Sequence, residues 1–122
     1  MTATARQRES LGAYGEAVAA RHLVDQGMVV LDRNWRCPDG EIDLVLRDGQ
    51  VLVVCEVKTR RSTAYGTPLE AVTATKAARL RRLAARWVAA HDLRVPDVRI
   101  DLVGIVCPQD APPTIDHVAG VG

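Results

Sequence analysis

The sequence predicts an α/β domain in which helices flank a central mixed β-sheet, with the elements in the order αβββαβ. Two observations lead to this class: two segments have apolar residues at helical spacing, and several short apolar runs are bounded by turn residues. The chain has 122 residues, of which 48% are hydrophobic and 25% charged, as in an ordinary globular domain with one core. We therefore expect a flexible N-terminus over residues 1–9 and a single domain over residues 10–122.

The first helix is expected over residues 10–26, where Gly27 is suited to the C-terminal cap. Its expected apolar face consists of Leu11, Tyr14, Val18 and Leu23. A short strand over residues 28–31 follows. Residues 32–40 are rich in turn formers, so we expect a loop there.

A β-hairpin is expected next, because two apolar runs flank the turn-forming pair Asp48-Gly49. This predicts strands over residues 41–47 and 50–58. After a basic loop over residues 60–66, a helix begins at Thr67, which has the form of a capping box, or at Thr73, and runs to about His91. Its expected buried face consists of Leu80, Leu83, Ala84, Trp87 and Val88. A strand over residues 98–106 and a short edge strand over residues 114–118 complete the chain.

The turn also predicts the register of the hairpin, in which Leu44 pairs with Val53. Because side chains alternate along a strand, one face of the hairpin is wholly apolar and should be core. That face consists of Ile42, Leu44, Leu46, Val51, Val53, Cys55 and Val57. The other face carries Asp43, Glu56 and Lys58, with the two acids as diagonal neighbours roughly 7–8 Å apart.

Two carboxylates and an amine on one surface suit the hydrolysis of phosphodiesters. The carboxylates repel each other, and a hard cation such as Mg²⁺ or Mn²⁺ relieves that repulsion. Such an ion polarises a phosphate and activates water, while Lys58 can stabilise developing charge or position the nucleophile. On spacing alone, a solvated strand end with a cross-strand ion pair is an equally good interpretation.

The arrangement of Asp43 followed by Glu56-Val57-Lys58 on the next strand resembles the PD-(D/E)xK nuclease motif, with Ile42 in place of its proline. That superfamily includes restriction enzymes and Holliday junction resolvases. The resemblance implies a restriction-endonuclease-like fold, a metal held by Asp43 and Glu56, and a further acid on the first helix, here Glu16. The alternative for Glu16 is that it lies at an exposed edge of its helical stripe.

The chain more closely resembles the small bacterial YraN-like family over most of residues 15–105. The matching segments, in order, are GEAVAARHL, RNWR, GEIDLV, VCEVKTRR, YGTPLEAV, TKAARLRRLAARWV and RIDLVGI. This resemblance implies the nuclease-like fold more firmly than it implies a reaction.

Several basic and aromatic residues are candidates for contact with nucleic acid. Arg60 and Arg61 directly follow the motif, and Arg33 lies beside Trp35, which could stack on an unpaired base. Lys76 is one of only two lysines among 16 basic residues, and the superfamily places a basic or polar residue there near the site. Solvent exposure is the alternative for Lys76, and an ordinary charged outer face is favoured for the arginines of the second helix.

The sequence therefore predicts a divalent-metal-dependent DNA endonuclease, acting on branched or flapped DNA. The rival is a nucleic-acid-binding or assembly module with a weak or inactive site, and a third possibility is an enzyme of small phosphorylated molecules. A junction cutter needs two sites, which makes a homodimer attractive. Three cysteines without paired spacing, no signal peptide and no membrane-length apolar run predict a soluble, cytoplasmic protein.

Overall fold

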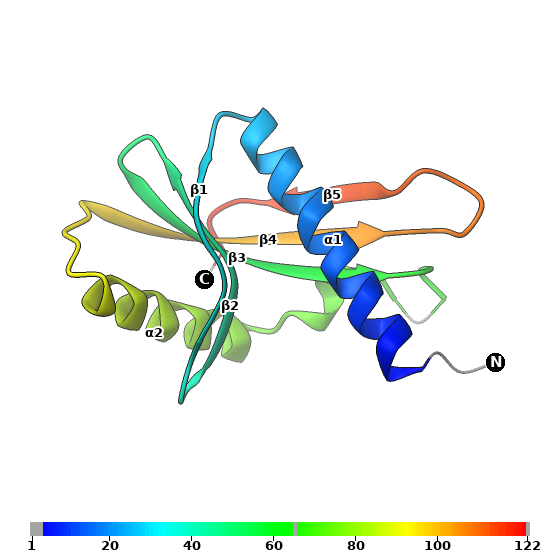
Figure 1. Ribbon diagram of the computed structural model, residues 1–122, viewed down its shortest axis with the longest axis horizontal. Coiled ribbons are helices and arrows are strands. Elements are labelled where there is room, and N and C mark those ends of the chain that lie inside the picture. The colour runs from blue at the N-terminus through cyan, green and yellow to red at the C-terminus, as the bar shows by residue number, and fades with distance from the viewer. Residues whose placement is uncertain (1–3, 65, 122) are drawn as a thin grey trace.

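The computed structural model describes residues 4–64 and 66–121, and it is an α/β domain built on one five-stranded mixed sheet (Figure 1). Its elements are α1 (Ala5–Asp25), β1 (Val29–Cys37), β2 (Gly40–Asp48), β3 (Val51–Arg60), the 3₁₀ helix η1 (Pro68–Ala71), α2 (Ala74–Ala90), β4 (Asp97–Val106) and β5 (Thr114–Val118). The strands lie in the order β1-β2-β3-β4-β5. Only β3 and β4 run parallel among these neighbours, because α2 forms the crossover between them. The predicted class is confirmed, and the arrangement is compatible with a restriction-endonuclease-like fold.

Both faces of the sheet are buried, each under one helix. On one face α1 crosses the sheet and covers a core that includes Leu44, Val53 and Val103. On the other face α2 covers a second core that includes Val45 and Val54. Apolar residues lie on both sides of the hairpin, because a parallel pair with a helical crossover is covered on both faces.

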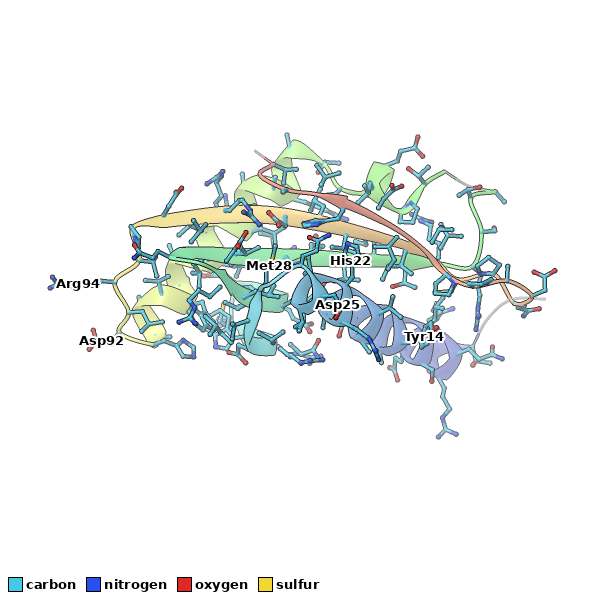
Figure 2. All side chains as sticks on the ribbon, turned by 90° about the horizontal axis from the view of Figure 1, so that it is seen from above. Tyr14, His22, Asp25, Met28, Asp92 and Arg94 are labelled. Atoms are coloured by element: carbon cyan, nitrogen blue, oxygen red, sulfur yellow. The ribbon has the colours of Figure 1, made fainter. Side chains whose placement is uncertain are left out.

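Helix α1 begins at Ala5, five residues before the predicted start. A capping box explains this, since Gln7 N donates to Thr4 Oγ1 (3.1 Å) and Thr4 N donates to Gln7 Oε1 (2.8 Å). Residues 1–3 of the expected flexible segment lie outside the described residues. Tyr14 was wrongly placed on the apolar face: it is 51% exposed on the outer side of α1 (Figure 2). The buried face consists of Gly15, Ala19, Ala20 and Leu23.

The loop predicted over residues 32–40 is wrong, because β1 continues to Cys37. Its backbone pairs with β2 over this stretch, for example Trp35 with Ile42. A side-chain contact also holds the strand, since Trp87 Nε1 of α2 donates to Asp32 Oδ2 (2.9 Å). Asn34 adopts φ +51° inside the strand. Tertiary pairing thus overrides the local turn preference of this segment.

The predicted hairpin register is wrong by two residues. Asp48 pairs with Val51 across a turn at Gly49-Gln50, and Leu44 pairs with Cys55. Because side chains alternate with a period of two, a slip of two residues leaves the predicted residues on their faces. Ile42 is the exception. It packs with the α2-side core although Leu44 packs with the α1-side core, so β2 changes face between them.

Both predicted starts of the second helix serve as caps. Thr67 opens η1, where its N–H donates to Glu70 Oε2 (2.5 Å), and Thr73 is the N-cap of α2, accepting from Lys76 N (3.3 Å). His91 is the C-cap, as expected from the predicted end. The last two strands lie where predicted, with β4 one residue longer. Tyr65, within the predicted basic loop, lies outside the described residues.

Two further expectations concern the cysteines and membrane-spanning helices. All three cysteines are free thiols, in agreement with their unpaired spacing. In the described part of the chain, no helix is both long enough and apolar enough to cross a membrane.

Candidate functional site

A cavity of about 310 Å³ lies between the sheet and the N-terminal half of α2. Its walls consist of Glu41, Asp43, Glu56, Val57, Lys58, Lys76, Arg79, Leu80 and Leu83. Four of the residues predicted from the sequence therefore meet at one cavity: the three motif residues and Lys76. Acidic and basic side chains thus line the same concave surface.

The local geometry of β2 and β3 positions the two motif acids. Regular pairing between these strands ends at Leu44 and Cys55, and the next residues are Asp43 and Glu56. The two acids therefore lie just beyond the last regular pair of the hairpin, and both line the cavity. Beyond the last pair, Val57 N donates to Asp43 Oδ2 at 2.9 Å, so the Asp43 carboxylate takes the place of a backbone acceptor. This bond holds one carboxylate oxygen on β3 and leaves the other for a ligand.

Asp43 lies among negative charges in a partly desolvated position. Burial is the largest effect and raises the pKa of Asp43 to about 7. The hydrogen bond from Val57 N acts in the opposite direction, while Glu56, Glu16 and Glu41 raise the pKa further. At neutral pH this position therefore favours either a proton or a nearby cation.

Glu16 approaches this acidic cluster from α1. Burial raises its pKa, a side-chain hydrogen bond from Asn34 lowers it, and Glu41 and Arg33 have smaller opposing effects. Glu16 is half-buried and is not part of the cavity wall. The structure thus brings Glu16 within electrostatic reach of Asp43 and not into direct contact with the cavity.

The donor set suits a divalent cation with few protein ligands. Among residues 4–64 and 66–121, no three His, Cys, Asp or Glu side chains are arranged to hold a metal ion together. Two carboxylates, those of Asp43 and Glu56, share the cavity. This fits Mg²⁺, which usually keeps several waters and takes one or two carboxylates from the protein. Glu16 was expected as a third metal ligand, but it does not form a three-residue metal-binding group with Asp43 and Glu56 among the described residues.

Comparison with known proteins identifies the family. The model of "Uncharacterised protein family UPF0102" matches residues 15–105, which is most of the chain. The chain belongs to this family. UPF0102 proteins from Nocardioides sp. and Kineococcus radiotolerans are 66% and 59% identical to it, and the alignments cover 99% and 95% of this chain and 98% and 96% of those proteins. Family membership is therefore confirmed, as the resemblance to the YraN-like family had predicted.

The other residues predicted to bind nucleic acid are dispersed around this UPF0102 protein. Arg60 and Arg61 lie outside the cavity wall, and Arg61 Nη1 donates to the Cys107 carbonyl oxygen at 3.5 Å. Arg33 is exposed and close enough to Glu16 to lower its pKa. Trp35 is half-buried against the α2-side core, with its ring 6.4 Å from that of His91. Trp35 does not line the carboxylate cavity, but it shares another surface cavity with Arg86 of α2.

Sequence reasoning missed Arg79, which it had assigned to the charged outer face of α2. Arg79 lines the cavity together with Lys76. These two positions are three residues apart, and residues three apart lie on the same side of a helix. That spacing was the available signal.

Asp101 lies outside the cavity wall and pairs with an arginine. Its side chain is fully buried and accepts from Arg99 Nε (2.8 Å), Arg99 Nη2 (3.0 Å), His117 Nε2 (2.8 Å) and Gly120 N (3.1 Å). Arg99 also donates to Asp48 Oδ2 (3.0 Å). This network joins β4 to β5 and to the β2–β3 turn.

Proposed function

We propose that this UPF0102 protein is a divalent-metal-dependent nuclease of the PD-(D/E)xK superfamily that hydrolyses phosphodiester bonds in DNA. One observation carries the proposal: Asp43, Glu56 and Lys58, from adjacent strands of one hairpin, line a single cavity. The spacing of these residues along the chain is also compatible with a solvated strand end. Their position in one shared cavity supports a catalytic site instead. Branched or flapped DNA is the proposed substrate class.

The residues present fit a Mg²⁺ or Mn²⁺ ion. Asp43, through the oxygen that Val57 N does not occupy, and Glu56 would hold it, and neutralising their mutual repulsion would favour its binding. When bound, such an ion polarises the scissile phosphate and lowers the pKa of water.

The chain itself supplies orientation and charge. The Lys58 ammonium lies in the same cavity and stabilises the negative charge that develops on the phosphate, or orients the attacking water. Lys76 and Arg79, on the opposite wall, hold the phosphate in place. Glu16 acts through the electrostatics of the acidic cluster, as a positioning residue.

The decisive experiment is a cleavage assay on junction, flap and single-stranded DNA with Mg²⁺ or Mn²⁺. Wild type is expected to cleave at least one of these substrates. Asp43→Ala and Lys58→Ala should reduce cleavage by at least about 100-fold, the usual scale for a lost electrostatic or acid–base group. Arg94→Ala serves as the matched charge-removal control, because Arg94 is exposed at one end of the molecule (Figure 2) and does not line the cavity. Equal cleavage by Lys58→Ala and wild type would contradict the proposal.

A second candidate is a nucleic-acid-binding or assembly module with a weak or inactive site. The observation that favours it is that the described acids do not form a group of three around one position. Under this alternative, DNA binds but stays intact with every metal tested. A junction-cleaving enzyme would further be expected to form a homodimer, which sedimentation equilibrium measures directly.

A further inference from the structure

A second cavity, of about 350 Å³, adjoins the carboxylate cavity. Its walls consist of Asp39, Arg79, Arg82 and Arg86. Arg79 lines both cavities, so the two share one wall. The second cavity lies between α2 and the β1–β2 turn, where the tip of this hairpin bends out of the sheet beside α2 (Figure 1).

The three arginines form one stripe along α2. Their spacing of three and four residues places them on the same side of the helix. The stripe extends about 10 Å from Arg79 to Arg86, at ~1.5 Å per residue. That length is sufficient to contact more than one consecutive phosphate of a single DNA strand. All three side chains are exposed, so they are accessible to a ligand.

Gly40 keeps Arg79 close to the hairpin. Its φ of +146° favours glycine, and a Cβ at this position would collide with the Arg79 guanidinium. The guanidinium therefore lies directly against the backbone of the hairpin, where β2 begins. It occupies the boundary between the two cavities, facing the motif acids on one side and Arg82 on the other.

The sizes of the cavities favour a single strand over a duplex. Each is at the lower end of the ~300–1,000 Å³ typical of ligand pockets, which enclose one small molecule. Two connected spaces of this size accommodate consecutive nucleotide units. A duplex presents both strands across a much wider rigid surface.

We propose that a single strand of DNA leaves the carboxylate cavity beneath Arg79 and continues along α2, with its phosphates on Arg82 and Arg86. This inference rests on the proposed function and specifies its substrate: a single-stranded segment is bound beside the cut site. It adds Arg82 and Arg86 to the residues predicted to contact nucleic acid.

A substitution at Asp39 should strengthen DNA binding, whereas loss of an arginine from the stripe should weaken it. Its carboxylate forms an ion pair with Arg86 at 2.6 Å, and both side chains are about half exposed. A phosphate must displace this carboxylate to reach Arg86. Asp39→Asn should therefore strengthen binding by about twofold to fivefold, the scale of an exposed ion pair. A gain in binding is not produced by misfolding.

The binding experiment uses a fluorescein-labelled oligothymidylate in EDTA, with anisotropy measured over a range of salt concentrations. Arg82→Gln should weaken binding and reduce the magnitude of the log–log salt slope by about 0.7, corresponding to one lost phosphate contact on a single strand. Arg21→Gln is the matched control, because Arg21 is an exposed arginine on α1, across the sheet. Its slope should equal that of wild type.

The outcomes separate this inference from the proposed function. Binding with the expected variant pattern, but no cleavage with Mg²⁺ or Mn²⁺, would support the strand path and refute the nuclease. Cleavage by wild type, with equal effects of Arg82→Gln and Arg21→Gln, would refute the path and leave the nuclease standing. Tighter binding of blunt duplex than of oligothymidylate, or no gain with Asp39→Asn, would also overturn the path.

Discussion

The surroundings of Asp43 disfavour the ionised form of its carboxyl group. Burial and the neighbouring acids raise its pKa from 3.8 to about 7. Since the folded-state pKa is raised, folding favours the protonated acid, and this contribution to stability is fully present below about pH 3.8 and is lost as the pH rises through about 7. Without metal, the Asp43 carboxylate therefore destabilises the fold at alkaline pH.

We expect Asp43→Asn to stabilise the metal-free protein at pH 8. The amide oxygen can still accept from Val57 N, while the buried charge is removed. The gain should be about 2–4 kcal/mol, at ~1.4 kcal/mol per pKa unit, and should shrink at pH 4. Urea unfolding in EDTA at both pH values measures it. Asp92→Asn, in the exposed turn after α2, is the control (Figure 2). An equal effect at both pH values would contradict a titrating Asp43.

Among the elements, α1 packs unusually close to β3, and this contact positions Glu16. Gly15 lies against Thr59, and a Cβ on residue 15 would collide with the Thr59 side chain. The Thr59 hydroxyl is buried there without a hydrogen-bond partner. Glu16 follows Gly15 directly, so the depth of this contact sets how near α1 brings its carboxylate to the acidic cluster.

Gly15→Ala should move α1 away from the sheet and destabilise the fold by about 1–3 kcal/mol, as overpacking does. Combining it with Thr59→Ala, which removes the colliding atoms, should restore part of this loss. Chemical denaturation of the two single variants and the double variant measures the coupling. Ala17→Gly on the exposed side of α1 provides a helix-propensity comparison. Strictly additive effects at residues 15 and 59 would show that the contact does not limit packing.

For the molecule as a whole, metal binding should increase the free energy of unfolding. If Asp43 and Glu56 hold Mn²⁺ in the folded state only, the ion at ~100 times its dissociation constant should stabilise the protein by about 2.7 kcal/mol. Thermal unfolding with and without Mn²⁺ measures this. Glu56→Gln should abolish the shift, whereas Glu9→Gln, exposed on α1, should retain it. An unchanged melting temperature of wild type would count against a working site.

Asp101 makes the whole fold sensitive to acid. Burial by itself raises its pKa, but hydrogen bonds from Arg99, His117 and Gly120 outweigh that effect and lower it below 3.8. Because the folded-state pKa is lowered, the contribution of Asp101 to stability is present above the unfolded-state value and is lost as the pH falls through the folded-state value.

Asp101→Asn should therefore destabilise the protein at pH 7 by about 3 kcal/mol, because it removes the charge partner of a buried network. At pH 3 the difference from wild type should narrow. Urea midpoints at the two pH values measure both effects. Asp48→Asn, which removes only the more exposed partner of Arg99, should cost less. A loss that is the same at both pH values would indicate a purely steric role.

The local pattern of the sequence determined which elements form and which motif residues share a surface. Alternation along β3 keeps Glu56 and Lys58 on one face even when the register slips by two residues, because a strand repeats every two residues. Asp43 lines the same cavity, although β2 changes face beside it. Tertiary structure alone decided the extension of β1 through Asp32 and the arrival of Arg79 at the cavity. The physical reason is distance: periodicity and capping depend on neighbours along the chain, whereas these outcomes depend on contacts between elements that meet only after the sheet and α2 have packed.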